Sequence, residues 1–420
     1  MPRLERQNAW NMANRIDHGS GSRGAQSPFT SGKKPPRIAF VQDALPFWGG
    51  AERLLSQALS VFPEAHLYAL IFNPSPFRGT LIGGAKVYTS FIDRLPGADW
   101  NHRIFFPLYP LAVENFDLSA YDLVVSFSYA AAHGVLTRSS QAHLALFYRP
   151  LRQAYSASGQ MVTGSWPHRF ILQTLLHVFR RWDRKAAARP GRILAISHWV
   201  ADLVRQAYGR PAEVIYPPVE IERFYAAPER QDYFICVSRM QPYKRLDLVV
   251  EAFNRLGLPL LMVGDGRQKA RLRKMAGTNI RFLRHQTDGQ VAELLSRAKA
   301  FVHAGVEDFG IALVEAQAAG CPVIAYQRGG ASETIIHKRT GILYPEQTVE
   351  SLIDAVLAFE SRRYRFSPQE LHASAERFSA QRFRSEFAAH IQSVLDGRSF
   401  WKFSHERFKI STRTALQTLE

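Results

Sequence analysis

The chain has 420 residues and a formal net charge of +17, and 46% of its residues are hydrophobic and 21% charged. The length predicts two or three domains, and the composition is ordinary for a soluble globular protein. No stretch reaches the roughly 18 uninterrupted apolar residues of a membrane-spanning helix, and the polar segment 1–36 lacks the apolar core of a secretory signal. The two cysteines, Cys236 and Cys321, lie in apolar runs, which argues against a disulfide framework or a cysteine metal site. We therefore expect a cytoplasmic protein.

The excess of positive charge is the unusual bulk property of the chain. Such a charge attracts anionic partners, which are nucleic acid, acidic lipid or phosphorylated substrates. Charge alone does not choose among these three classes, so the choice rests on the motifs.

Residues 1–36, rich in Asn, Ser, Gly, Arg and Lys, are expected to form a flexible basic tail. The first ordered unit then covers 37–213. It begins with a short apolar run, a glycine turn and a helical pattern from Ala51 to Val61. Helical stretches separate further apolar runs, and this alternation predicts a doubly wound parallel sheet. The predicted strands are 37–43, 67–72, 123–126, 143–147 and 192–196.

A double proline at Pro217-Pro218 interrupts the pattern and marks a linker. The alternation restarts in a second unit, 214–377, with a helix expected over 244–255. Two successive α/β units predict two facing domains, with a ligand cleft lined by the carboxyl ends of their strands. The predicted strands of the second unit are 233–237, 260–263, 280–283, 300–303 and 322–325.

Two cations follow the predicted strand that ends at Val237. Arg239 offers a planar fork of donors and Lys244 a point charge, a combination suited to binding a diphosphate. A solvated basic loop is the alternative interpretation of this segment.

Two glutamates flank the start of another predicted helix. Glu307 precedes it, Gly310 and Ile311 lie at its N-terminus, where free N–H groups attract anions, and Glu315 lies about one turn inside. On one helix Glu307 and Glu315 would be ~12 Å apart along the axis, whereas hydrolytic carboxylates lie ~5 to 9.5 Å apart. We therefore interpret both as acceptors for the sugar and ribose hydroxyls of a nucleotide sugar. Compensation of the helix dipole is the alternative.

Glycine turns and one histidine complete the candidates. Gly49-Gly50 follows the first strand and opens a helix, so its backbone could approach a phosphate closely. His133 follows the strand ending near Ser126 and could reach the cleft, although a lone histidine is more often structural. No H-E-x-x-H, C-x-x-C or P-loop signature occurs, so no metal site is predicted.

The segment 167–189 repeats apolar residues at helical spacing and carries six Arg or Lys residues. A basic amphipathic helix near tryptophans fits an anionic membrane surface, whereas an ordinary core-facing helix with a solvated back is the alternative. The stretch 398–409 repeats the basic and aromatic composition.

Taken together, these segments resemble the family 4 glycosyltransferases of the GT-B fold, over about Arg37 to Leu395. Segments 116–125 and 214–219 are similar to bacterial mannosyltransferases of O-antigen and exopolysaccharide synthesis. The motifs that carry the resemblance are Gly49-Gly50-Ala51-Glu52, Val237-Ser238-Arg239 with Lys244-Arg245, Gly264-Asp265-Gly266, the Glu307-x7-Glu315 pair and Gly329-Gly330.

The resemblance implies a retaining enzyme that closes two domains over a nucleotide sugar and needs no cofactor and no metal. Residues 378–420 would cross back to the N-terminal domain. It implies catalytic roles for His133 and Glu307 near the reacting sugar, and for Arg239 and Lys244, which would stabilise the negative charge on the departing nucleoside diphosphate. The donor would also be held by the Arg239 and Lys244 cations on the pyrophosphate, by Glu315 on the ribose, and by backbone at Gly49, Gly50, Gly310 and Ile311.

Two departures from the family pattern fall in the acceptor-side domain. The family usually carries histidine where Tyr148 stands, and close relatives often carry lysine where His133 stands. The implied function is transfer of mannose from GDP-mannose to a lipid-diphosphate-linked glycan, by a protein peripheral on the inner face of the cell membrane. A UDP-sugar donor, a nucleotide-sugar epimerase and a basic nucleic-acid-binding protein are the alternatives, although no nucleic-acid motif appears.

Overall fold

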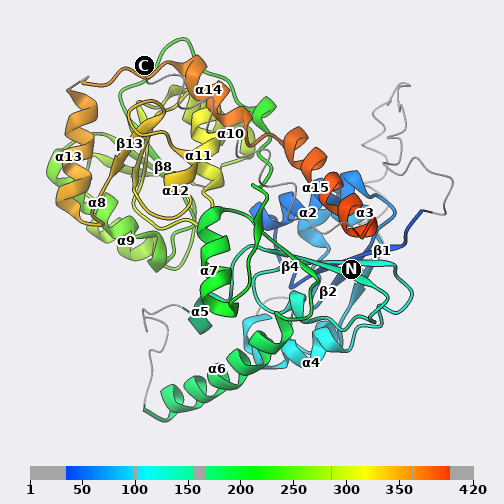
Figure 1. Ribbon diagram of the computed structural model, residues 1–420. Helices are drawn as coiled ribbons and strands as arrows, with labels where there is room; N and C mark the ends of the chain where they lie inside the picture. Colours follow the sequence, from blue (N-terminus) through cyan, green and yellow to red (C-terminus); the bar gives the residue numbers. More distant parts are fainter. Residues whose placement is uncertain (1–34, 99–101, 156–165, 285, 362, 398–420) are drawn as a thin grey trace, which may run out of the picture. The chain divides into compact units, whose positions relative to one another are not determined.

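The computed structural model describes residues 35–98, 102–155, 166–284, 286–361 and 363–397 (Figure 1). The predicted tail 1–36 lies almost wholly outside the described residues, and the basic aromatic stretch 398–409 lies entirely outside them.

The first lobe is built on a seven-stranded sheet with the order β3-β2-β1-β4-β5-β6-β7, and every pair is parallel. Strands β1 and β4 lie inside the sheet and are fully buried, so they read as continuous rather than alternating apolar runs. The strands are β1 Ile38–Gln42, β2 His66–Ala69, β3 Val87–Thr89, β4 Leu123–Ser128, β5 Ala142–Phe147, β6 Arg192–Ala195 and β7 Glu213–Val214.

Helices and 3-10 turns connect these strands. Helix α2 buries Leu54, Leu55 and Leu59 on one face, and α7 has a serine N-cap, Ser197, and a left-handed glycine at its end. The connecting elements are α2 Gly50–Val61, α3 Leu81–Gly84, α4 Tyr109–Glu114, α5 Arg152–Tyr155, α6 Trp166–Ala186 and α7 His198–Tyr208, with η1 Ser75–Phe77, η2 Phe91–Arg94, η3 His102–Leu108 and η4 Ala132–Gly134.

The second lobe is built on a six-stranded parallel sheet with the order β10-β9-β8-β11-β12-β13. Helices α8, α9 and α13 pack on one face, while α10 and α11 contact each other on the other (Figure 1). The strands are β8 Phe234–Val237, β9 Leu260–Val263, β10 Ile280–Phe282, β11 Ala300–His303, β12 Val323–Tyr326 and β13 Gly341–Tyr344. The other elements are η5 Ile221–Arg223, η6 Pro242–Lys244, α8 Leu246–Leu256, α9 Lys269–Met275, α10 Asp288–Arg297, α11 Ile311–Ala318, α12 Ala331–Thr334, α13 Val349–Glu360, α14 Pro368–Glu376 and α15 Ala380–Leu395.

Both sheets therefore have the doubly wound order that the sequence predicts, and the fold class is confirmed. The strand order reverses between β1 and β4 in the first sheet and between β8 and β11 in the second. Ligands of such sheets bind at this reversal, outside the carboxyl ends of the strands. The loops after β1, β8 and β11 carry Gly50, Lys244 and Glu307, respectively.

The last described helix, α15, packs on elements of the first lobe. Phe387 on α15 lies among Phe40, Phe62 and Phe127, with ring centroids 6.0 to 6.1 Å apart, and α15 contacts α2 and β5. The domain limits that the sequence suggests, 37–213, 214–377 and 378–420, stay a prediction.

Three strands were not expected from the sequence. β3 has three half-buried residues, β7 has only two, and β13 begins with a glycine, Gly341. Short or half-exposed strands lack the long apolar run that makes a central strand visible. Gly341 lies so close to β12 that an added Cβ would be 2.1 Å from the carbonyl oxygen of Val323.

Candidate functional site

Lys244 and Glu307 meet at the carboxyl ends of β8 and β11. Lys244 ends the turn η6, and its Nζ lies 2.5 and 2.6 Å from the two carboxylate oxygens of Glu307. The Nε2 atom of His303, the last residue of β11, lies 2.9 Å from Oε1 of the same carboxylate. The structure thus brings together the predicted diphosphate cation and the predicted sugar acceptor.

The ionisation of Glu307 follows from these two neighbours. Burial by itself would raise the pKa of Glu307, but the Lys244 ammonium and the His303 ring outweigh burial and hold that pKa well below its usual range. Glu307 is therefore a carboxylate across the physiological pH range and accepts, rather than donates, hydrogen bonds.

Helix α11 begins just after this carboxylate. Gly310 is its N-cap residue, has φ 95° and offers no side chain to the helix end. The first N–H groups of α11 are thus positioned to meet an anion, with the positive end of the helix dipole behind them. A Cβ added to Gly310 would lie 2.7 Å from the side chain of Leu313, which explains the need for glycine.

The glycine turn of the first lobe reaches the same helix end. Gly49 is the N-cap residue of α2, and Gly50 is its first residue. A Cβ added at Gly50 would lie 2.7 Å from Cδ1 of Ile311. Gly49, Gly50, Gly310 and Ile311 are therefore close together, although the sequence places them in two different units.

Glu315, the second glutamate, has a partner that sequence analysis missed. Its Oε1 lies 3.5 Å from a guanidinium nitrogen of Arg53 on α2, and another nitrogen of Arg53 lies 2.6 Å from Asp288. Arg223 also contacts Asp288, at 3.0 Å. Burial raises the pKa of Glu315, and Arg53 and Arg223 only partly offset this rise. The predicted ribose acceptor is thus held by a cation of the opposite lobe.

Arg239 lies apart from the Lys244–Glu307 pair. It is exposed, and its guanidinium carbon lies 6.0 Å from the centre of the Phe47 ring. The loop that carries Arg239 packs tightly against the next glycine turn, because a Cβ at Gly264 would lie 2.0 Å from the carbonyl oxygen of Ser238. Gly264 therefore positions the loop rather than contacting a ligand itself.

His133 is buried within the first lobe, away from this cluster. Its Nδ1 lies 2.9 Å from the Ser128 hydroxyl and its Nε2 lies 3.1 Å from Oδ1 of Asp183, and both side chains of the latter pair are almost fully buried. Asp183 also accepts hydrogen bonds from Tyr155 and Tyr208, at 2.7 and 2.9 Å. This surrounding favours a positioning role, and direct contact of His133 with the sugar stays a prediction.

Comparison with known proteins identifies the second lobe. Residues 219–378 match the protein family described as Glycosyl transferases group 1. They form a group 1 glycosyltransferase domain. This domain includes β8, β11 and α11, and so contains Arg239, Lys244, Glu307 and Glu315.

Two relatives and one solved structure extend the likeness. A GDP-mannose-dependent alpha-(1-6)-phosphatidylinositol monomannoside mannosyltransferase of Mycobacterium tuberculosis is 29% identical over 215 residues, 44% of this chain. The match covers 56% of that relative, so the chain spans about half its length. The D-rhamnosyltransferase WbpZ of Pseudomonas aeruginosa is 27% identical over 320 residues, covering 71% of this chain and 79% of WbpZ. The crystal structure of Anabaena HepE in complex with UDP has a TM-score of 0.63 at 17% identity and covers 85% of this chain and 100% of that chain, a likeness of fold.

The segment after β5 contacts both the first lobe and the glycosyltransferase domain. Tyr148, where the resemblance leads to an expectation of histidine, donates its hydroxyl proton to the carbonyl of Ala51 at 2.9 Å. Arg149 and Arg152 contact the two carboxylate oxygens of Asp308 at 2.7 and 3.2 Å. In the sequence, the two arginines near Tyr148 were the sole sign of these ion pairs with Asp308.

Glu333 follows the glycine turn Gly329-Gly330 and contacts the first lobe. Its two carboxylate oxygens accept hydrogen bonds from the backbone N–H groups of His198 and Trp199, both at 2.8 Å. Glu333 therefore satisfies the free N-terminus of α7, a stabilising arrangement for a carboxylate.

Two general features of the described part of the chain bear on the site. Its residues contain no group of three or more His, Cys, Asp or Glu side chains that could hold a metal ion, and metal-independent catalysis stays a prediction. Within the same part, every helix is too short or too polar to cross a lipid bilayer.

Replacing His133 with alanine is expected to lower the free energy of unfolding by about 1–3 kcal/mol, because it leaves Asp183 buried without one of its partners. We expect the transfer rate to fall more than donor affinity. Thermal unfolding and nucleotide titration measure the two effects. His177→Ala, on the exposed side of the same helix that carries Asp183, is the control. An H133A variant with unchanged stability would contradict the assigned network.

Glu52 on α2 is expected to make stability depend on pH. Burial raises its pKa to about 7, and Arg239 lowers it less. Between the ordinary glutamate pKa and about pH 7, the folded protein keeps Glu52 protonated while the unfolded chain loses this proton. The free energy of unfolding therefore falls as the pH rises through this range, by up to about 3 kcal/mol. Between about pH 5 and about pH 8 the melting temperature of the wild type should therefore fall further than that of Glu52→Gln. The exposed Glu64→Gln is the control, and equal falls in E52Q and the wild type would contradict the expectation.

Proposed function

We propose that this protein is a retaining glycosyltransferase that moves mannose from GDP-mannose onto a lipid-diphosphate-linked glycan in cell-surface polysaccharide synthesis. The observation that carries the proposal is the Lys244–Glu307 pair beside the open N-terminus of α11, within a group 1 glycosyltransferase domain. A cation, a helix end and a fixed carboxylate at one sheet edge provide the complementary charges for a nucleotide sugar.

The donor pyrophosphate would be held by positive charge from three sources: Lys244, Arg239 and the N-terminus of α11. In the proposed bound state Lys244 leaves the Glu307 carboxylate and contacts phosphate oxygens instead. His303 then keeps Glu307 in place, and Glu307 accepts hydrogen bonds from hydroxyls of the sugar. The backbone at Gly50 and Ile311 would approach the phosphates closely, because Gly50 has no side chain of its own between the two helix ends.

The chemical step transfers the sugar between two oxygens. The bond from the anomeric carbon to the β-phosphate oxygen breaks, and a bond from the same carbon to the acceptor hydroxyl oxygen forms on the same face of the ring. The hydroxyl proton leaves with the departing diphosphate. Preorganised cations stabilise the negative charge that develops on this leaving group, so the proposed mechanism uses Lys244 and Arg239 where other enzymes use a metal.

Glu315 would bind the ribose of the donor. In the structure Glu315 pairs with Arg53. When the donor enters, Glu315 would leave Arg53 and bind the ribose hydroxyls instead. Arg53 retains Asp288 as a partner at 2.6 Å, so this exchange does not strand the guanidinium. The Arg53 contact thus keeps a buried carboxylate paired until the donor arrives.

Mannose as the sugar and a lipid as the acceptor rest on the relatives. The mycobacterial relative is described as GDP-mannose-dependent and as acting on a phosphatidylinositol monomannoside. We propose that the reaction takes place on the inner face of the cell membrane, with the protein as a peripheral component. The complex of HepE with UDP keeps a UDP-sugar donor as the second candidate.

The proposal is tested by incubating the protein with radiolabelled GDP-mannose and a lipid extract of the cells that produce it. Transfer of label to the lipid phase, with the α-configuration of the donor retained in the product by NMR, is the expected result. An inverted product would contradict the retaining mechanism, and transfer from UDP-sugars alone would replace mannose with another sugar. Slow release of GDP without an acceptor provides a second readout of donor use.

A further inference from the structure

The first lobe exposes a group of large aliphatic side chains that is separate from the candidate site. Six such residues have exposed fractions between 37% and 66%. They lie on η3, on α4, on α6 and in the loop after η4, and we call this surface the η3–α4–α6 face. Its residues are Ile104, Leu108, Leu111, Leu136, Leu175 and Val178.

Packing of η3 and α4 against α6 brings two of these side chains, Leu111 and Val178, to the same side of the lobe. The rings of Phe106 and Phe179 lie 4.5 Å apart, and Trp182 donates its indole N–H to Glu114 at 2.7 Å. Leu111 lies about one turn before Glu114 on α4, and Val178 lies one turn before Trp182 on α6. Residues three or four apart share a helix face, so Leu111 and Val178 lie on the same side as this hydrogen bond.

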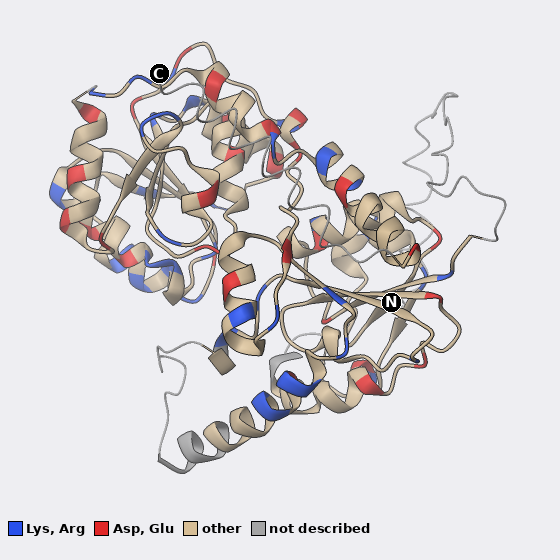
Figure 2. Ribbon diagram, in the orientation of Figure 1, with Lys and Arg blue, Asp and Glu red and all other residues tan. Residues whose placement is uncertain are grey.

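A band of positive charge borders the η3–α4–α6 face. On α6, Arg181 and Lys185 lie three and seven residues after Val178, on the same side of the helix, and both are exposed. Figure 2 shows Lys and Arg residues on this part of α6. Exposed aliphatic side chains with an adjoining row of Arg and Lys are the pattern of a helix that lies in a membrane interface, with the cations toward the lipid phosphates.

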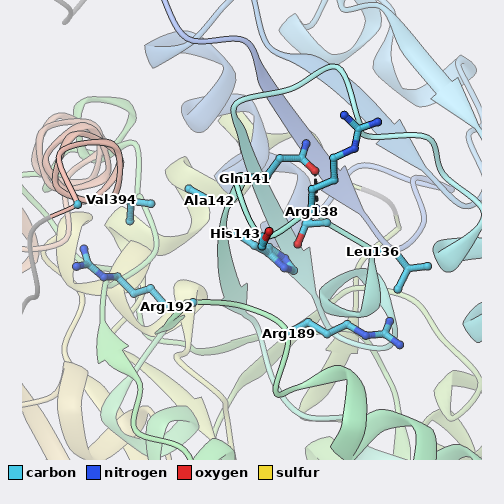
Figure 3. Close-up of a pocket in the computed structure, with 12 residues that line it drawn as sticks. Leu136, Arg138, Gln141, Ala142, His143, Arg189, Arg192 and Val394 are labelled. Carbon is cyan, nitrogen blue, oxygen red and sulfur yellow. Dashed lines mark hydrogen bonds between the residues drawn. The ribbon is translucent and has the colours of Figure 1, made fainter.

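A hollow of about 500 Å³ lies at the other end of the face, and two of its arginines, Arg189 and Arg192, are paired with Glu114 and Glu213. It lies at the amino ends of β5 and β6, opposite the strand ends that carry the candidate site, and Leu136, Arg138, Arg189 and Arg192 line it (Figure 3). Arg189 contacts both Glu114 on α4 and the carbonyl of Gly134, so it joins the hollow to the η3–α4–α6 face.

We propose that the η3–α4–α6 face binds an anionic lipid bilayer. The charge is complementary to acidic headgroups, and the six aliphatic side chains are those that would enter the boundary between headgroups and acyl chains. The inference rests on the proposed function insofar as a lipid-linked acceptor requires a lipid surface.

The same helix is physically connected to the candidate site. Arg180 on α6 donates to the carbonyl of Ala154 on α5 at 2.5 Å. Arg152, the first residue of α5, contacts Asp308, the neighbour of Glu307. A bilayer held by α6 would therefore be linked through one short helix to the loop that carries the predicted sugar acceptor.

Co-sedimentation of the full chain with vesicles tests the proposal. The wild type is expected to bind phosphatidylcholine vesicles that contain phosphatidylglycerol, to bind pure phosphatidylcholine less, and to be released by salt. The double variant Leu111→Glu, Val178→Glu should partition at least about tenfold less, because it places charge where apolar contact is required. Leu357→Glu, which changes another exposed leucine (51% exposed) on α13, is the control and should bind as the wild type does.

Two further measurements keep the test specific. The double variant should retain its melting temperature and its affinity for nucleotide, since both side chains are exposed and distant from Lys244. The Arg181→Ser, Lys185→Ser variant should lose the preference for the anionic vesicles. Wild-type protein that binds neither vesicle, or a double variant that binds both equally well, would overturn the proposal. So would self-association through this face in sedimentation velocity without lipid. Loss of nucleotide binding would count against the proposed function and not against this surface.

Discussion

Replacing Lys244 with alanine is expected to lower the rate of sugar transfer by about 10²–10³-fold while leaving the fold intact. Lys244 is the cation at the end of η6 that contacts both oxygens of Glu307, and we assign it to the donor pyrophosphate. Its removal takes away positive charge that would be needed most when the diphosphate leaves. Steady-state transfer from GDP-mannose measures the effect, with circular dichroism to check the fold.

Two companion variants make this result specific to the site. Lys269→Ala removes a lysine that pairs with Asp265 near the surface, and it should transfer sugar at the wild-type rate. Glu307→Gln should lose transfer but keep its affinity for GDP, because GDP has no sugar hydroxyls for Glu307 to hold. A K244A variant with wild-type turnover would remove Lys244 from the catalytic set.

Replacing Glu315 with glutamine is expected to abolish most transfer, chiefly through weaker donor binding. A carboxylate that accepts hydrogen bonds from two ribose hydroxyls contributes about 1.5–3 kcal/mol for each charge-assisted bond, and the neutral amide loses much of this. The expected change is a rise of about 10–100-fold in the KM for the donor. Initial rates over a range of GDP-mannose concentrations give this value.

The control for Glu315 is a glutamate of similar helical setting outside the site. Glu376→Gln on α14 is exposed and should leave KM unchanged. Glutamine at position 315 can still accept one hydrogen bond from Arg53, so the contact between the lobes is expected to persist. An unchanged KM in E315Q would return Glu315 to a purely structural role as the partner of Arg53.

Local sequence signals were sufficient for the parts of the fold that lie at the centre of each sheet. β1, β4, β8 and β11 are buried apolar runs, and the loops that follow them carry their polar residues at the carboxyl ends. Because parallel strands end at one edge, the sequence placed Lys244 and Glu307 at the same sheet edge, but their contact depends on β8 and β11 being neighbours, which no local pattern gives. The edge strands β3 and β7 could not be predicted, because they are short or half-exposed, and β13 was missed although it is buried, because it begins with glycine and follows directly on a polar segment.

Long-range pairing was the part of the site that no local pattern revealed. Arg53 reaches Glu315 across 262 positions of the sequence, and Arg149 reaches Asp308 across 159. The burial of His133 was equally hidden, because its partner Asp183 lies in a segment whose amphipathic pattern fitted both a membrane-surface helix and a core-facing helix with a solvated back. The sequence alone predicts that a charged residue on such a helix, such as Asp183, faces solvent, because its buried partner lies elsewhere in the chain.

Calorimetric titration of the purified protein with GDP, UDP and ADP, without added divalent metal, tests the central claim most directly. The account predicts that GDP binds in preference to the other two nucleotides and that Lys244→Ala weakens this binding. Preferential binding of UDP would keep the nucleotide-sugar site and exclude mannose from GDP-mannose as the transferred sugar. Binding of none of the three would contradict the claim that this cleft holds a nucleoside diphosphate, and would leave the positive charge to be explained by nucleic acid.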